Sequence, residues 1–138
     1  GYDPSVPHGI IAAPEDRSAT IQWYNGNYST TGATGTAIGT GNANTNTIVT
    51  AQGTSVDYAA RYCAELNLNG KQDWYLPSRD ELNKLFINQR LIGGFAINTY
   101  WSSTEFANFN AWIQNFDDGN QLINNKTNTF YVRAVRAF

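Results

Sequence analysis

Cysteine is almost absent from this chain of 138 residues, and methionine is absent altogether. The single cysteine, Cys63, excludes an intrachain disulfide and a cysteine metal cluster. Because Cys63 falls on the apolar side of an expected helix, we interpret it as a small buried hydrophobe and not as a reactive thiol. His8 is the only histidine, and no nucleophile is singled out near it, so we expect neither a hydrolytic triad nor any other enzyme activity.

The chain also lacks an excess of one charge and lacks long apolar runs. Its formal net charge is -2, with no cluster of Lys or Arg, so nucleic acid and anionic membranes are not expected as partners. No segment approaches the roughly 18 apolar residues that span a bilayer, so membrane insertion is not expected. Residues 1–9 are polar and rich in turn formers, which favours a piece excised from a longer protein over a signal peptide.

Aromatic residues are plentiful, with 4 Trp, 8 Tyr and 7 Phe, so aromatic rings must carry much of the core. The first half of the chain predicts short strands at residues 9–13 and 19–23. Residues 24–47 are almost all Asn, Gly, Thr, Ser and Ala, a composition that predicts one long loop. The 30–46 part of this loop either flanks a binding face or satisfies itself through side-chain hydrogen bonds.

Two helices are expected in the middle of the chain. Residues 55–68 place apolar side chains at helical spacing and end at an Asn-Gly pair. Ser78 and Glu81 have the spacing of a capping box, in which each side chain satisfies a free N–H group at a helix start. Between the two helices, residues 73–77 are expected to be extended because Pro77 disfavours helix at the residue before it.

The last forty residues predict strands at 100–103, 111–116, 121–124 and 130–138, with a hairpin turn at 117–120. The chain is therefore expected to be a single α+β domain over residues 1–138, with two helices, a C-terminal antiparallel sheet and long loops. Four aromatic residues in expected strands are assigned to the core, in preference to a platform for carbohydrate: Trp74, Tyr75, Trp101 and Trp112. Arg133 and Arg136 are expected to pair with carboxylates such as Glu105 or to hydrogen-bond to loop backbone.

Four motifs in order, DWYLPSRDEL, YWSSTE, AW..NF..G and the terminal VRAVRAF, resemble the Lcl C-terminal domain family. The resemblance extends over nearly the whole chain and implies a C-type-lectin-like fold, related to formylglycine-generating enzymes. Those enzymes need a cysteine pair, so their activity does not carry over. The EPN, QPD and WND motifs of calcium-dependent lectins are absent. Asp117, Asp118 and Asn120 offer oxygen ligands for calcium, but a hairpin turn uses the same residue types, so no metal and no cofactor are expected.

The Asn-rich segment between YWSSTE and VRAVRAF resembles the variable proteins of diversity-generating retroelements of bacteria and their phages. In those systems, adenines of Asn codons are randomised, and the encoded residues form a binding face. The resemblance implies an extracellular domain, on a bacterial cell surface or a phage virion, that binds an unknown protein or glycan ligand on a cell surface. The residues expected to bind the ligand are Phe106, Ala107, Asn108, Phe109, Asn110, Ile113, Asn115, Asp117, Asp118, Asn120, Leu122, Ile123, Asn124, Asn125, Thr127, Asn128 and Phe130.

All of these residue types are reachable from an AAC or AAT codon whose two adenines are randomised. Four residues of the segment are not reachable and must be framework or come from other codons: Trp112, Gln114, Gln121 and Lys126. Strand alternation over 111–116 predicts that Trp112 and Phe116 point into the core, and that Ile113 and Asn115 point outward. An outward Ile beside Phe106, Phe109, Leu122, Ile123 and Phe130 would make an exposed apolar patch, which usually marks an interaction site.

Two other readings of this segment remain open. In the first, Phe106, Phe109, Leu122 and Phe130 are buried core residues, and the Asn residues are ordinary turn formers. In the second, the domain is a fixed adhesin or oligomerisation module without diversification, and the apolar residues form the interface of a homo-oligomer.

Overall fold

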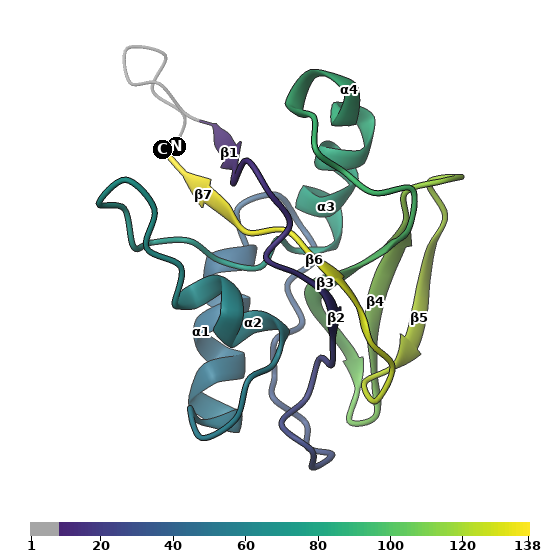
Figure 1. Cartoon of the computed structure of the whole chain (residues 1–138). Coiled ribbons are helices and arrows are strands. Elements are labelled where there is room, and N and C mark those ends of the chain that lie inside the picture. The colour runs from purple at the N-terminus through teal and green to yellow at the C-terminus, as the bar shows by residue number, and fades with distance from the viewer. Residues whose placement is uncertain (1–8) are drawn as a thin grey trace.

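The computed structural model describes residues 9–138 and shows an α+β protein with a five-stranded sheet, a two-stranded sheet and four helices in that part of the chain (Figure 1). In chain order the elements are β1 (Ile10–Ala12), β2 (Ser18–Ile21), α1 (Gly41–Gln52), α2 (Ala59–Ala64), α3 (Arg79–Ile87), α4 (Gln89–Ile92), β3 (Thr99–Ala107), β4 (Asn110–Asn115), β5 (Gln121–Asn125), β6 (Phe130–Val132) and β7 (Val135–Ala137).

The larger sheet is mixed, which corrects the expected antiparallel arrangement. Its strand order is β2-β6-β3-β4-β5. The β3–β4 and β4–β5 pairs are antiparallel hairpins, but β6 returns beside β3 and runs parallel to it, with Tyr100 opposite Tyr131. Only residues 126–129 connect β5 to β6, yet β6 pairs with the other side of β3, and residue spacing alone does not reveal this parallel pair.

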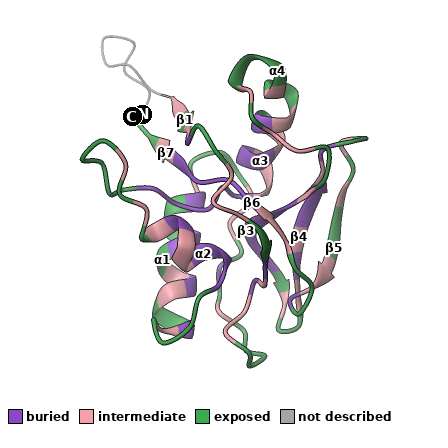
Figure 2. Ribbon diagram, in the orientation of Figure 1, coloured by how far each residue is buried: buried purple, intermediate pink, exposed green. Residues whose placement is uncertain are grey.

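The larger sheet is packed on both faces. On one face, Trp101, Ile113 and Val132 contact side chains from α1 and α2, including Ile48 and Ala59. On the other face, an aromatic cluster gathers around α3. Its rings lie 4.5–5.6 Å apart at their centroids and come from Phe86, Phe95, Tyr100, Phe116 and Tyr131. Figure 2 accordingly shows β3 and β4 largely buried, while β5 at the edge is exposed or half-buried.

The outward orientation predicted for Ile113 is therefore wrong. Ile113 is 5% exposed and belongs to the core beneath α1 and α2. Simple alternation assigns one face of a strand to the core and the other to solvent, but here both faces of β4 are covered for most of its length. Phe116 is buried as predicted, whereas Trp112 is only half-buried. The core assignments of Trp74, Tyr75 and Trp101 are confirmed.

Helix α1 begins inside the 24–47 segment that was expected to be a loop and ends beyond it at Gln52. Its sequence, GNANTNTIVTAQ, has few apolar residues, and its first residue lacks a side-chain cap from Thr40. A distant carboxylate supplies the cap: Glu81 Oε1 accepts from the Gly41 N–H at 3.0 Å, and Glu81 Oε2 accepts from the Gly39 N–H at 3.2 Å. The helix therefore depends on a tertiary contact that its own residues do not indicate.

Glu81 performs this role in addition to the predicted one. The capping box between Ser78 and Glu81 is present at the start of α3, and the Tyr75 hydroxyl donates to Glu81 Oε2 at 3.0 Å. Burial first and the nearby Glu81 carboxylate second raise the pKa of Tyr75, so its hydroxyl stays a donor. One buried carboxylate thus joins two helix starts and the extended segment before α3.

The remaining expected elements differ mainly in extent. Helix α2 is shorter than the predicted 55–68 because Asn69 and Gly70, both at positive φ, form a separate turn that pairs Leu68 with Lys71. The short helix α4 was not predicted, so the expected count of two helices is wrong. The turn at 117–120 joins β4 and β5 as predicted.

The expected terminal strand 130–138 is two strands, because the chain leaves the larger sheet at Arg133 and joins β1 as β7. The buried Arg133 guanidinium pairs with Asp16 at 2.9 Å and donates to the Ala13 carbonyl. Arg136 pairs with Asp73. Both arginines pair with carboxylates as expected, but neither pairs with Glu105.

Cys63 is fully buried, and burial raises the pKa of its thiol to about 12, as expected for a structural residue. Within residues 9–138, every helix is too short or too polar to cross a bilayer.

We predict that Gly41→Ala lowers the free energy of unfolding by about 2 kcal/mol, because the new Cβ would lie 2.2 Å from Glu81 Oε1 and displace a buried cap. Urea titration followed by circular dichroism measures the change. Asn42→Ala, at the exposed next position of the same turn, is the matched control and should leave stability unchanged or slightly higher. Equal stability of the two variants would show that the Glu81 cap is dispensable.

Candidate functional site

Large apolar side chains are exposed where β3, β4 and β5 run past the edge of α3. Phe106 is 57% exposed, Phe109 49%, Leu122 56% and Ile123 38%. Leu122 alternates with Ile123 along β5 and lies opposite Ile113, so it faces the other side of the sheet. We call the surface formed by Phe106, Phe109, Ile123 and the half-buried Trp112 the β3–β5 surface. The Phe106 ring meets Trp112 edge-on, Trp112 lies directly opposite Ile123 in the β4–β5 pair, and Phe109 lies in the turn between β3 and β4.

Trp112 is the centre of the β3–β5 surface. Phe106 contacts one part of its ring at a centroid distance of 6.1 Å, and the Arg79 guanidinium lies over the ring at 5.0 Å from its centroid. The Arg79 backbone is held from both sides, because its N–H donates to Thr104 Oγ1 and its carbonyl accepts from Gln121 Nε2. Arg79 thus places a cation beside the apolar surface from the first position of α3.

Sequence reasoning missed Arg79, because it lies more than twenty residues before the Asn-rich segment. The sequence shows only that Arg79 directly follows the capping residue Ser78. This position indicates that Arg79 begins a helix, but it does not indicate that Arg79 lies beside an exposed apolar surface. Trp112 was assigned to the core because strand alternation places it on the same face as Phe116. Phe116 is buried, whereas Trp112 is only half-buried.

A buried ion pair lies directly beneath the β3–β5 surface. Lys126 Nζ donates to Glu105 Oε2 at 2.7 Å, and both side chains are essentially inaccessible to solvent. Lys126 also donates to the Ser29 carbonyl and lies 4.6 Å from the centroid of the Trp23 ring. Glu105 accepts from the Thr31 and Gly32 amides at 2.9–3.1 Å. The pair therefore joins the end of β3, the turn after β5 and the loop before α1.

The electrostatics of the pair favour an ionised Glu105. Burial by itself raises the pKa of this carboxyl, but the hydrogen bonds from Lys126, Thr31 and Gly32 outweigh that effect and leave the pKa below its ordinary value. A carboxylate whose pKa is lowered by folding stabilises the folded state above its unfolded-state pKa, and this contribution is lost as the pH falls.

The loop before α1 borders the β3–β5 surface at its lower end. The Tyr28 hydroxyl donates to Asn125 Oδ1 at 2.8 Å, and residues 31–35 hydrogen-bond to Glu105 and to Asn44. The 30–46 segment is held by side-chain hydrogen bonds, as one of the two readings predicted.

Of the residues expected to bind a ligand, Ile113 is the only one that is buried. Phe130 is half-buried and packs edge-on against Trp101 at 5.0 Å, so it belongs partly to the core. Several of the polar residues close turns: Asn115 Oδ1 accepts from the Asp117 N–H, Asp118 Oδ1 from the Asn120 N–H, and Asn125 Oδ1 from the Thr127 N–H. The reading in which Phe106, Phe109 and Leu122 are core residues is wrong, whereas the turn-forming role of these Asn and Asp residues is present.

The four residues that randomised Asn codons cannot encode all have structural contacts. Lys126 and Gln114 are fully buried, and Trp112 and Gln121 are half-buried. Gln114 Nε2 donates to Asn83 Oδ1 and to the Gly119 carbonyl, and Gln121 Nε2 donates to Gln114 Oε1 and to the Arg79 carbonyl. These residues hold β4, β5 and α3 together beneath and beside the exposed positions.

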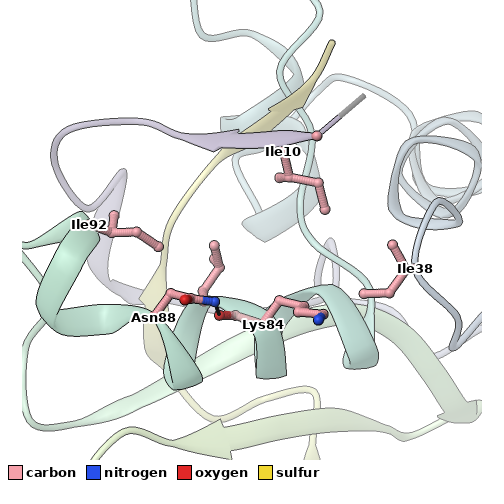
Figure 3. Close-up of a pocket in the computed structure, with 7 residues that line it drawn as sticks. Ile10, Ile38, Lys84, Asn88 and Ile92 are labelled. Carbon is pink, nitrogen blue, oxygen red and sulfur yellow. Dashed lines mark hydrogen bonds between the residues drawn. The ribbon is translucent and has the colours of Figure 1, made fainter. Parts of the chain in front are cut away.

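A cavity of about 520 Å³ lies on another part of the molecule, between β1, α3 and α4 (Figure 3). Ile10, Ile38 and Ile92 point toward it, and Lys84 and Asn88 line its floor. Among the described residues that line it, there is no carboxylate, thiol or imidazole. Within residues 9–138, no three His, Cys, Asp or Glu side chains gather so as to hold a metal ion. His8 lies outside the described residues.

Residues 13–136 match the family model described as the Lcl C-terminal domain. No curated protein matches the chain.

We predict that Glu105→Gln lowers the free energy of unfolding by about 3–5 kcal/mol at pH 7, because it leaves the Lys126 ammonium buried without its counter-charge. The difference from the wild type should narrow below about pH 4.3, where Glu105 of the unfolded chain becomes protonated and the ionised pair loses its advantage. Urea unfolding between pH 3 and 7 measures both effects. Glu15→Gln makes the same chemical change at an exposed position and should leave the stability curve unchanged. A constant difference across this pH range would contradict the role of the ionised pair.

Proposed function

Because the chain belongs to the Lcl C-terminal domain family, we propose that it is a non-enzymatic, ligand-binding display domain of C-type-lectin-like fold. The proposed binding site is the β3–β5 surface with the surrounding Asn, Asp and Thr residues of segment 106–130. The proposed setting is the surface of a bacterial cell or a phage particle, where the domain binds a protein or glycan of another cell surface.

The observation that carries the proposal is the division of segment 106–130 into two groups of residues. The four residues that randomised Asn codons cannot encode are all buried or half-buried, and Lys126 and Gln114 are fully buried. Apart from Ile113, the expected binding positions are exposed or half-buried. This distribution supports a surface whose side chains vary while the framework beneath them stays constant.

The physical mechanism of binding follows from the composition of the β3–β5 surface. Phe106, Phe109 and Ile123 expose large apolar areas whose removal from water on binding is favourable by roughly 25 cal/mol per Å². Rigid aromatic anchors surrounded by adaptable polar groups are also typical of antibody paratopes. The Glu105–Lys126 pair and the Gln114–Gln121 hydrogen bonds hold the strands in place, so little order has to be gained on binding.

The proposed diversification is tested in the DNA around the gene. We expect a near-copy of the segment encoding residues 100–138, in which the binding positions read AAC or AAT, close to a reverse transcriptase gene. Codons for Trp112, Gln114, Gln121 and Lys126 should be the same in both copies. If the flanking DNA contains no such copy, the proposal of diversification is contradicted. The domain would then be a fixed adhesin or oligomerisation module.

The proposed binding surface is tested with arrays of bacterial surface glycans and surface proteins. We expect Phe106→Ala and Phe109→Ala each to weaken binding to array positives by at least tenfold, with a melting temperature within about 2 °C of the wild type, because both side chains are exposed. Leu91→Ala is the matched control, since Leu91 is 88% exposed on α4, and it should bind as the wild type does. Equal loss in all three variants would place the binding site elsewhere.

A further inference from the structure

The β5 strand forms an open edge of the larger sheet, next to the β3–β5 surface. It is last in the strand order, and Figure 1 shows no element on its outer side. Its five residues pair with β4 without a register shift, and they include no charge and no proline. Natural sheets usually block such edges with charges, prolines or bulges, because the free N–H and C=O groups pair readily with another strand.

The hydrogen bonds at both ends of the β4–β5 pair identify which backbone groups are free. The Asn115 N–H donates to the Asn120 carbonyl, and the Lys126 N–H donates to the Phe109 carbonyl. Since hydrogen-bonded pairs alternate along an antiparallel ladder, Leu122 and Asn124 bond to β4, whereas Gln121, Ile123 and Asn125 point their backbone groups away from it.

The structure limits this free edge to a short segment. The Asn125 N–H already donates to Asn124 Oδ1, and the Asn125 carbonyl accepts from the Asn128 N–H. Within residues 9–138, the backbone groups of Gln121 and Ile123 have no such substitute partner. The Ile123 side chain lies on the same face as Trp112, so a strand added at this edge would extend the β3–β5 surface directly.

We propose that β5 binds an extended polypeptide segment of the partner, which adds to the sheet as a further strand and pairs with the backbone of Gln121 and Ile123. This inference rests on the proposed function and assigns its ligand to the protein class, because backbone N–H and C=O groups at strand spacing are complementary only to another polypeptide. An apolar side chain of the segment would lie beside Ile123 and Trp112. A basic side chain would lie near the exposed Asp117 and Asp118, which form no ion pair within the described residues.

The experiment uses a phage-displayed library of random twelve-residue peptides, selected on the immobilised wild-type protein. The decisive variant is Ile123→Pro, which removes the outward N–H and leaves the hydrogen bonds between β4 and β5 in place. Ile123→Ala is its matched control, because it removes the side chain and keeps the N–H. We expect the selected peptides to bind Ile123→Pro at least tenfold more weakly than Ile123→Ala, and to carry an apolar residue and a basic residue in an alternating pattern. Both variants should keep the circular dichroism spectrum of the wild type.

Three outcomes would overturn the proposal: a library that yields no binder, peptides that bind the two variants equally, and a dimer of the protein itself that Ile123→Pro abolishes. Amide chemical shifts give a second measurement, since peptide addition should move the Gln121 and Ile123 signals more than those of Leu122 and Asn124. The outcomes distinguish failure of strand addition from failure of the proposed function. If array binding depends on Phe106 and Phe109 while Ile123→Pro and Ile123→Ala bind equally, the β3–β5 surface is a binding site without strand addition.

Discussion

The buried ion pair between Glu105 and Lys126 is the interaction on which the candidate site depends. Two opposite charges removed from water must satisfy each other at close range, because neither has solvent as an alternative partner. Here the requirement is met by a 2.7 Å hydrogen bond together with donors from Thr31 and Gly32 and an acceptor at Ser29. Since these groups come from three separate parts of the chain, the pair sets the positions of the end of β3, the turn after β5 and the loop before α1. The β3–β5 surface lies between these points.

The rest of the framework follows the same principle, in which a buried polar group joins elements that are distant in sequence. Glu81 accepts hydrogen bonds at the starts of both α1 and α3, and the Gln114–Gln121 contact ties β4 and β5 to the backbone of Arg79. Buried polar groups of this kind are costly unless all are satisfied, so they select one arrangement of the chain over alternatives that hydrophobic packing alone would permit. The exposed side chains of Phe106 and Phe109 lie outside this set of buried polar contacts.

A surface built in this way separates affinity from stability. Phe106, Phe109 and Leu122 are exposed, so we expect their replacement to leave the framework intact. Phe130 packs on Trp101 and Ile113 lies within the core, so we expect their replacement to destabilise the fold. The open edge at Ile123 adds backbone hydrogen bonding to the side-chain contacts of the same surface. Arg79, held over Trp112 by contacts to β3 and β5, contributes a cation that does not belong to the Asn-rich segment.

Local sequence determined those features whose causes lie within a few residues of one another. The capping box at Ser78 and Glu81, the extended segment before Pro77 and the hairpin turn at 117–120 all follow from short-range chemistry, and all are present. The motif order indicated the family, and the composition of segment 106–130 indicated which residues to examine for binding. Tertiary structure alone decided the rest. Helix α1 forms because Glu81 caps it from forty residues away, and Ile113 is buried because α3 and the two helices on the other side cover both faces of β4. Lys126, Trp112 and Arg79 acquire their roles for the same reason: burial and ion pairing depend on which distant segments meet, and the sequence of one segment does not contain that information.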